Sequence, residues 1–169
     1  MKRLAILISL ILIIGVSAGC GKKRVSLNPG VVKDLVVLTL DGDLPGQTGD
    51  QKHELDIVMK WMDRDIITNL KRSGFNAVLI KDMQEYTSGM GKLLVVDVDD
   101  FNAGNRAARA FVGFGAGAAS LDLSYRLLDE QGAVIIEWQD GVGSSKGGTY
   151  CAQTLNRNTI EKVVGQLNN

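Results

Sequence analysis

The sequence is poor in the residues from which most enzymes build an active site. Its 169 residues include one histidine, His53, and two cysteines, Cys20 and Cys151. A catalytic triad needs a histidine beside its nucleophile, and a zinc site needs three or four nitrogen, sulfur or carboxylate ligands. His53 stands in a polar stretch and is too isolated for either arrangement. We therefore predict that the protein is not an enzyme and that it holds no metal and no cofactor.

The chain also lacks an excess of charge of either sign. It carries 19 basic and 19 acidic residues, and three neighbouring cations, Lys22, Lys23 and Arg24, lie near its start. Without these three, the rest of the chain is mildly acidic. A nucleic-acid-binding domain normally presents a basic patch that neutralises phosphates. We therefore expect no nucleic acid among the partners.

The N-terminus has no hydrophobic run long enough to cross a bilayer. Lys2 and Arg3 precede an apolar run from Leu4 to Val16. At about 1.5 Å per residue this run is too short for roughly 30 Å of hydrocarbon. A positive start, a short apolar run and small residues are typical of a secretory signal peptide. We assign residues 1–19 to a lipoprotein signal peptide, for the following reason.

The stretch Ser17-Ala18-Gly19-Cys20 resembles the lipobox of bacterial lipoproteins. The resemblance implies cleavage before Cys20, a diacylglyceryl group on its sulfur and, in many bacteria, a further acyl chain on the new amine. Two or three acyl chains hold a protein on a membrane for long times. By the same resemblance, Gly21 in place of aspartate favours the outer membrane, with the protein facing the periplasm. The alternative is a plain secretory peptide that ends in small residues.

Residues 20–30 are the expected tether between this anchor and the folded part. The three cations in it either contact anionic headgroups, at about 1 kcal/mol each, or are simply solvated. If Cys20 is lipidated, Cys151 is left as a lone thiol. We expect it to be a small buried hydrophobe, and a reactive or intermolecular thiol is the alternative.

Residues 31–169 have the periodic patterns of a single α+β domain. Apolar runs and alternation predict strands over 31–40, 75–81, 92–99, 121–128 and 134–138, and spacings of three and four predict helices over 50–73 and 150–167. The first strand, helix and strand are expected to form a parallel unit, and the last two strands a hairpin. The order β-α-β-β-β-β-α predicts a two-layer sandwich, a mixed sheet of about five strands with two helices packed on it.

The ends and flanks of the first helix allow further predictions. Asp50 is expected to cap its N-terminus, and Gly74 to end it in the left-handed conformation. Ile57 and Trp61 widen its apolar stripe, which indicates either a partner surface or a wide core-facing arc. Later in the chain, the glycine-rich run 141–148 is expected to be flexible.

The stretch from 109 to 120 holds an almost complete dinucleotide-binding pattern, Gly113-x-Gly115-x-x-Ala118. Such a loop follows a strand and opens a helix, so that the pyrophosphate lies at the helix N-terminus. Here no strand of that kind precedes the glycines, and an alternating strand follows them. We therefore expect no nucleotide, and we interpret the glycines as a tight packing or contact loop.

The same region carries a family resemblance. Its residues are Gly104, Arg106, Arg109, Gly113, Phe114, Gly115, Gly117, Asp129 and Gly132. This Gly-x-Arg-x-x-Arg run, leading into Gly-Phe-Gly-x-Gly and an alternating strand with a glycine turn, resembles bacterial lipoproteins grouped as domain-of-unknown-function family 4410. The resemblance implies membership and an envelope location but no mechanism, because the family has no established activity.

Arg106 and Arg109, together with the glycine-phenylalanine segment that follows them, form the candidate contact site. Its members are Arg106, Arg109, Gly113, Phe114, Gly115 and Gly117. The two arginines either bind an anion, such as a headgroup or a glycan carboxylate, or form ordinary salt bridges with acidic residues of the chain.

A second group of charged residues is Asp97, Asp99 and Asp100. Two of the carboxylates share one face of a predicted strand and the third lies at its end. Several oxygen ligands are what Ca²⁺ requires. No calcium-binding loop accompanies them, so a solvated strand face is the preferred interpretation.

These observations support three functional hypotheses. The first is a non-enzymatic outer-membrane lipoprotein that acts as a periplasmic interaction or assembly module, with an envelope protein or further copies of itself as partner. The second is a binding module for an anionic envelope component, a lipid headgroup or a glycan, that uses Arg106 and Arg109. The third is an unrecognised hydrolase that uses Asp97 or Asp99, which requires a pocket that gathers these acids.

Overall fold

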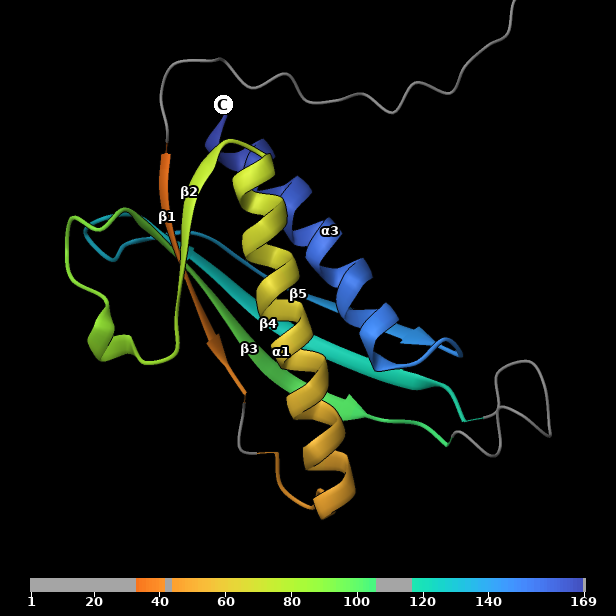
Figure 1. Cartoon of the computed structure of the whole chain (residues 1–169). Helices are drawn as coiled ribbons and strands as arrows, with labels where there is room; N and C mark the ends of the chain where they lie inside the picture. The colour runs from red at the N-terminus through yellow and green to blue at the C-terminus, as the bar shows by residue number, and fades with distance from the viewer. Residues whose placement is uncertain (1–32, 42–43, 106–116, 169) are drawn as a thin grey trace, which may run out of the picture.

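A five-stranded mixed sheet and two long helices make up the structure. The computed structural model describes residues 33–41, 44–105 and 117–168. Along the chain the elements are β1 (Lys33–Leu40), α1 (Gly49–Arg72), β2 (Phe75–Ile80), the short 3-10 helix η1 (Met83–Glu85), β3 (Lys92–Asn102), β4 (Ala119–Leu128), β5 (Val134–Ser144) and α3 (Gly148–Leu167) (Figure 1). This order confirms the predicted α+β class with its mixed sheet and two helices. No helix in the described ranges is long and apolar enough to cross a membrane.

The sheet has a parallel half and an antiparallel half, joined by β3. The strand order is β2-β1-β3-β4-β5. β1 pairs in parallel with both of its neighbours, so that Val36 lies opposite Val78 of β2 and Leu93 of β3. β3 with β4, and β4 with β5, pair antiparallel. We refer to β1, β2 and α1 as the parallel half, and to β4, β5 and α3, together with the chain from Asp97 of β3 onward that pairs with β4, as the hairpin half.

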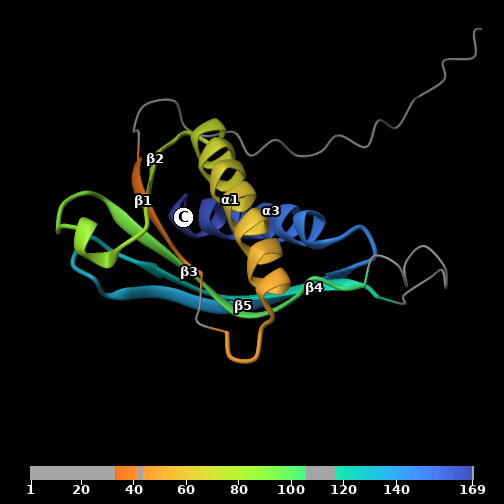
Figure 2. The ribbon, with the colours of Figure 1, turned by 60° about the horizontal axis from the view of Figure 1, so that its bottom comes forward.

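Both helices pack on the same face of the sheet and bury one core with it (Figure 2). From α1 this core receives Leu55, Val58, Met59, Met62, Ile66 and Leu70, and from α3 it receives Cys151, Ala152, Leu155, Val163 and Val164. The strands contribute alternate residues such as Val37, Leu94 and Leu123, all fully buried. Burial of one large apolar side chain contributes about 1.5–3 kcal/mol, so this core is the main source of stability.

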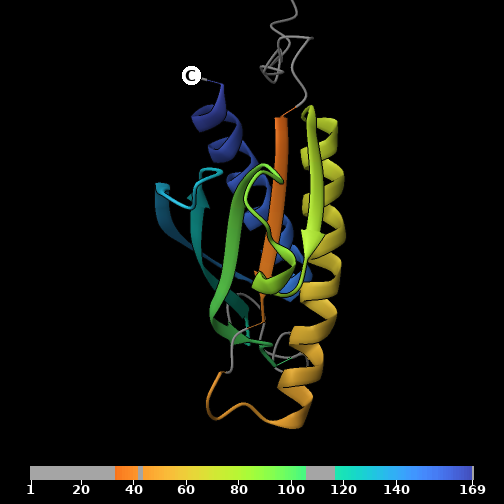
Figure 3. The same cartoon turned by 90° about the vertical axis from the view of Figure 1, so that its left-hand side faces the viewer.

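On the other face of the sheet, the central strand β1 is covered, whereas most of the hairpin half is uncovered. Val36 and Leu38 of β1 are not part of the main core, yet they are only 1% and 2% exposed. They belong to a second, separate buried cluster. The β2–β3 connection, which contains η1 and contributes Tyr86 to that cluster, lies across β1 (Figure 3). On β4, by contrast, Ser124 is half-buried and Arg126 is exposed.

The N-terminus of α1 is capped by Thr48, so the prediction of Asp50 as the cap is wrong. The Thr48 hydroxyl accepts a hydrogen bond from the Gln51 N–H, and the Gln51 side chain accepts one from the Thr48 N–H, at 3.3 and 3.0 Å. Both candidates are capping residue types, but only Thr48 is followed three residues later by a glutamine that can reciprocate. At the other end, Gly74 has a φ of 87°, which confirms the predicted left-handed residue.

β5 and β3 are longer than predicted. Gly141–Ser144 continue β5 and pair with the start of β4, so the prediction that 141–148 are flexible is wrong for these four residues. Glycine has a low strand propensity by itself, but pairing with a neighbouring strand outweighs that preference. β3 extends to Asn102 through a register shift between Val98 and Asp100.

Candidate functional site

The glycine-rich signature begins and ends at a narrow neck between β3 and β4. Gly104 and Gly117 have φ angles of +70° and +68°, in the left-handed region that favours glycine. The Asn105 N–H donates to the Gly117 carbonyl oxygen at 3.0 Å. A Cβ on Gly104 would clash with that same oxygen and would lie 2.7 Å from the Ala118 carbonyl carbon. Gly104 therefore permits the close approach of two backbone segments.

Other residues of the signature form the turn between β4 and β5. The Asp129 carboxylate accepts hydrogen bonds from the N–H groups of Gln131 and Ala133 at 2.9 and 2.8 Å. Gly132 has a φ of +84°, which the turn requires. The predicted hairpin is confirmed by the pairing of Tyr125 with Trp138.

The structure describes Gly117 among the six predicted contact residues, and Gly117 is part of the neck. The five others, Arg106, Arg109, Gly113, Phe114 and Gly115, lie outside the described residues, and so does Cys20. Anion binding by the two arginines and lipidation of Cys20 therefore stay predictions.

Polar side chains from three strands gather on the uncovered face of the hairpin half. We call this surface the open face, and its main residues are Asp97, Asp99, Asp122, Ser124, Arg126, Glu137 and Gln139. Ser124 lies opposite Asp97 on β3 and opposite Gln139 on β5. Its hydroxyl donates to the Asp99 carboxylate and accepts from the Gln139 amide at 3.2 Å. This network lines a hollow of about 530 Å³.

The open face places the predicted acidic residues on a broad surface. Asp97 is half-buried, Asp99 is exposed, and Asp100 lies directly opposite Asp122 across the β3–β4 ladder. Like charges in such positions repel each other. Among the described residues, no three His, Cys, Asp or Glu side chains are grouped closely enough to hold a metal ion. Asp97, Asp99 and Glu137 border the same wide hollow, so the arrangement is an acidic, partly exposed strand surface, and the hydrolase hypothesis stays a prediction.

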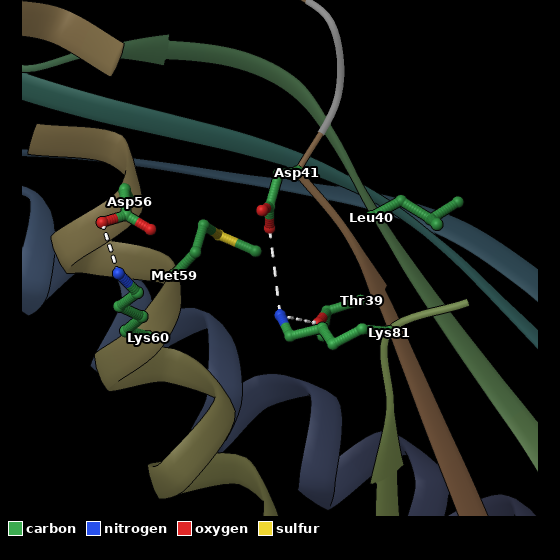
Figure 4. A pocket seen from close by; sticks show the side chains of 7 residues that line it. All are labelled: Thr39, Leu40, Asp41, Asp56, Met59, Lys60 and Lys81. Atoms are coloured by element: carbon green, nitrogen blue, oxygen red, sulfur yellow. Dashed lines mark hydrogen bonds and ion pairs between the residues drawn. The ribbon is translucent and has the colours of Figure 1, made fainter. Parts of the chain in front are cut away.

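A second hollow, of about 470 Å³, lies at the carboxyl ends of β1 and β2 beside α1 (Figure 4). Its lining residues are Thr39, Leu40, Asp41, Asp56, Met59, Lys60 and Lys81. The ends of parallel strands are a common place for ligands, so the hydrogen-bonding capacity of these side chains decides what the hollow can hold.

The charged groups of this hollow are largely bonded to one another. The Lys81 ammonium is 2.6 Å from a carboxylate oxygen of Asp63, donates to the Thr39 hydroxyl at 2.7 Å and lies 4.0 Å from Asp41. The Thr39 hydroxyl donates to the other Asp63 oxygen at 2.8 Å. Lys81 thus directs its donors at protein acceptors, and the cluster holds α1 to the strand ends.

Sequence reasoning missed this cluster, although one signal for it was present. Asp63 follows Met62 on the apolar side of α1 and its side chain is only 6% exposed. A buried carboxylate is costly unless it is paired and hydrogen-bonded. A carboxylate at an apolar position of a helix therefore predicts a nearby cation, but sequence spacing does not identify it as Lys81.

The remaining candidates have ordinary surroundings. Cys151 is fully buried with its sulfur 3.6 Å from the Ala119 carbonyl oxygen, and burial raises the pKa of its thiol. The prediction of a buried free cysteine is confirmed. His53 is exposed near the start of α1. Trp61 packs against the core and Ile57 is 47% exposed, so the wide apolar arc of α1 is mainly core-facing.

Comparison with known proteins gives a family match and similarities of backbone. The family model described as "Domain of unknown function (DUF4410)" matches residues 16–161. No curated protein matches the chain. A PelC dodecamer structure from Paraburkholderia phytofirmans aligns with a TM-score of 0.48 and 16% identity, covering 83% of this chain and 93% of that one. A neuraminyllactose-binding hemagglutinin homologue from Helicobacter pylori aligns with a TM-score of 0.47 and 11% identity, covering 83% and 92%.

Proposed function

Because this chain belongs to the protein family described as Domain of unknown function (DUF4410), whose description assigns no activity, we propose a role from its own sequence and surface. The protein is a lipoprotein of the bacterial envelope, anchored through Cys20 in the outer membrane and facing the periplasm. It works by binding another envelope protein and not by catalysis.

The anchor determines where such binding takes place. β1 begins at Lys33, 13 residues after Cys20. A fully extended tether of this length reaches roughly 45 Å. The folded part therefore stays close to the membrane and meets partners that lie on or near it.

The observation that supports binding is the open face of the hairpin half. An antiparallel sheet in a two-layer domain commonly leaves one face to the solvent, so the distinguishing feature of the open face is its hollow and its fixed polar groups, not its exposure. Here three strands present a polar surface with a hollow of about 530 Å³, and Ser124 is held in place by bonds to Asp99 and Gln139. Asp97, Asp99, Asp122 and Glu137 outnumber the one cation on this face, so it suits a partner that offers cations and N–H donors.

The anchor is tested by metabolic labelling with a palmitate analogue. The wild-type chain should be labelled and sediment with membranes. The Cys20→Ser chain should be unlabelled, uncleaved at that position and recovered with its signal peptide. Equal labelling of both chains would contradict lipidation at Cys20.

Binding through the open face is tested by a photo-cross-linking amino acid placed at Gln139 in cells. The matched control places it at Glu161, which is exposed on α3. We expect discrete adducts with another envelope protein from position 139 and none from 161. Recovery of the monomer alone at 139, or the same adducts at both positions, would overturn the proposal.

A further inference from the structure

The two strands at the edges of the sheet, β2 and β5, differ in how far their outer sides are protected. Each is paired on one side only within the described part of the chain. An unpaired edge presents a row of backbone N–H and C=O groups that can pair with another strand, and soluble proteins normally block such edges with charges, prolines or irregularities.

β5 carries several of these protections. Glu137 and Asp140 place two negative charges on this strand, and Gly141 and Gly143 weaken its tendency to extend a sheet. The Asp140 carboxylate also accepts a hydrogen bond from the Gly141 N–H at 2.9 Å, which occupies a backbone donor. Asn158 of α3 donates to the other Asp140 oxygen at 2.9 Å and keeps the carboxylate in place.

β2 carries none of them. Its six residues, Phe75–Ile80, include no charge, no proline and no glycine. The polar side chain of Asn76 is bonded to Asp34 on the neighbouring β1, at 2.7 Å. Val78 is 46% exposed. Short uncharged segments of high strand propensity are the ones that recruit further strands.

We propose that the β2 edge pairs with the β2 edge of a second copy of this chain, antiparallel, to form one continuous sheet across both copies. Such pairing brings the same segment against itself, so the segment must be self-complementary. β2 meets this condition because it has no charges to oppose one another. The corresponding pairing of β5 would bring the carboxylates of Glu137 and Asp140 close to their own copies. A symmetric pair is also closed, so it ends at two copies and does not grow into a fibre.

The strength of this contact depends on the membrane. A six-residue edge buries much less than the roughly 1,200 Å² of a stable interface, so the pair is weak in dilute solution. Two chains confined to one membrane surface have a far higher effective concentration. This step rests on the lipid anchor of the proposed function, whereas the choice of β2 over β5 rests on the structure alone.

The test compares two valine-to-cysteine variants of the full chain in cells, treated with a thiol cross-linker. Val78→Cys places the thiol on β2, and Val134→Cys places it on β5, where the native valine is 56% exposed. We expect the covalent dimer from Val78→Cys to exceed that from Val134→Cys by at least about tenfold. Equal yields, or Val78→Cys adducts with a different protein, would overturn the proposal. The chain without an added cysteine serves as a control for the anchor. A lipidated Cys20 has no free thiol, so a cross-linked dimer of this chain would show that the anchor is missing.

A second variant separates edge pairing from chance proximity. Asn76→Cys serves as the reporter, and Val78→Lys is added to it, which places two cations against each other only if the edges pair. Val78 is exposed, so folding, checked by circular dichroism, should be unaffected. We expect Val78→Lys to reduce the Asn76→Cys dimer at least about tenfold, and an unchanged yield would contradict the pairing. With the purified Val78→Cys chain in detergent, a dimer yield that rises with protein concentration supports the pairing whether or not Cys20 is lipidated, and a yield that stays at the Val134→Cys level overturns it.

Discussion

The parallel half and the hairpin half of this protein use the same sheet in different ways. In the parallel half, the central strand β1 is buried on both faces, by α1 on one side and by the β2–β3 connection on the other, while Val78 of the edge strand β2 is partly exposed. In the hairpin half, α3 covers one face, and the residues of the other face are half-buried or exposed, apart from Leu128. Parallel strands are connected by chain that crosses the sheet and covers it, whereas a hairpin needs only a tight turn. Connectivity therefore determines which part of the sheet is left uncovered.

The polar networks of the two halves differ in the same way. In the parallel half, Asp63 is buried and depends on Lys81 and Thr39. In the hairpin half, Asp99, Ser124 and Gln139 are bonded to one another in contact with water. A buried network is costly to break, because the remaining charge cannot be hydrated, while an exposed network exchanges its bonds with water.

The largest expected difference concerns the face of the sheet that α1 and α3 do not cover. Leu38→Ala, in the parallel half, should lower the free energy of unfolding by about 3 kcal/mol, because Leu38 is 2% exposed and its removal leaves a cavity. Ser124→Ala, in the hairpin half, should change it by less than about 0.5 kcal/mol. Urea unfolding followed by circular dichroism measures both. Similar values for the two variants would refute the two-sided burial of β1.

The ion pair of the parallel half gives the next largest effect. Lys81→Met should destabilise the fold by about 2 kcal/mol, less than for a fully buried pair because water reaches the half-exposed Lys81 site. The same change at Lys60, whose partner Asp56 is exposed, should cost less than about 0.5 kcal/mol.

A double variant checks the cause of that loss. If Lys81→Met destabilises by leaving the Asp63 charge unpaired, then adding Asp63→Leu should recover part of the stability. If adding Asp63→Leu instead lowers the free energy of unfolding further below that of Lys81→Met, the unpaired charge is not the cause of the loss. Thermal and urea unfolding give the three free energies of the cycle.

The neck of the hairpin half should also be sensitive, but through its backbone. Gly104→Ala should cost about 2 kcal/mol, because the position has a φ of +70° and the new Cβ would clash with the Gly117 backbone. Gly141→Ala should cost less than about 1 kcal/mol, because its Cβ meets the end of the flexible Asp122 side chain. A Gly104→Ala chain as stable as Gly141→Ala would show that the neck is not closely packed.

The smallest expected effect is a dependence of the free energy of unfolding on pH. It arises from two titratable groups that are buried in the main core of the hairpin half. Burial raises the pKa of Cys151 above its ordinary value of 9.0, and burial raises that of Tyr125. The unfolded chain therefore releases these protons at lower pH than the folded chain. Their contribution to stability is complete below about pH 9 and is lost as the pH rises above it.

The variant Cys151→Ala shows how much of the loss of stability at high pH comes from the Cys151 thiol. The variant should be less stable at every pH because it loses buried volume, but its stability should fall less steeply between about pH 8 and pH 10. Urea unfolding at a series of pH values provides the slopes. Identical slopes for the two chains would mean that Cys151 does not titrate differently in the folded and unfolded states.

Much of the difference in burial between the two halves could be predicted from local sequence patterns. The continuous apolar run of β1 and the alternation along β4 correspond to two-sided and one-sided burial. The glycines at 104 and 117 indicated a special backbone, and Cys151 a small buried residue. These properties depend on the period of side-chain directions along the chain, which each segment carries by itself.

The meeting of Thr39, Asp63 and Lys81 could not be predicted, and neither could the contrast between the β2 and β5 edges. Both depend on β1 lying between β2 and β3, and strand order is a global choice that local periodicity does not encode. The helix cap shows the same limit on a smaller scale, since Thr48 and Asp50 are both suitable types and the reciprocal bond with Gln51 selects one.

Residue types and their spacing thus determine which segments are strands or helices, which of their sides avoid water and where the backbone must turn. The folded chain adds what sequence neighbours cannot specify: the covered and uncovered parts of the sheet, the partner of the buried Asp63 and the unprotected edge at β2. The physical reason is that burial and pairing depend on contacts between segments that are far apart in sequence, and these contacts exist only once the strands are in order.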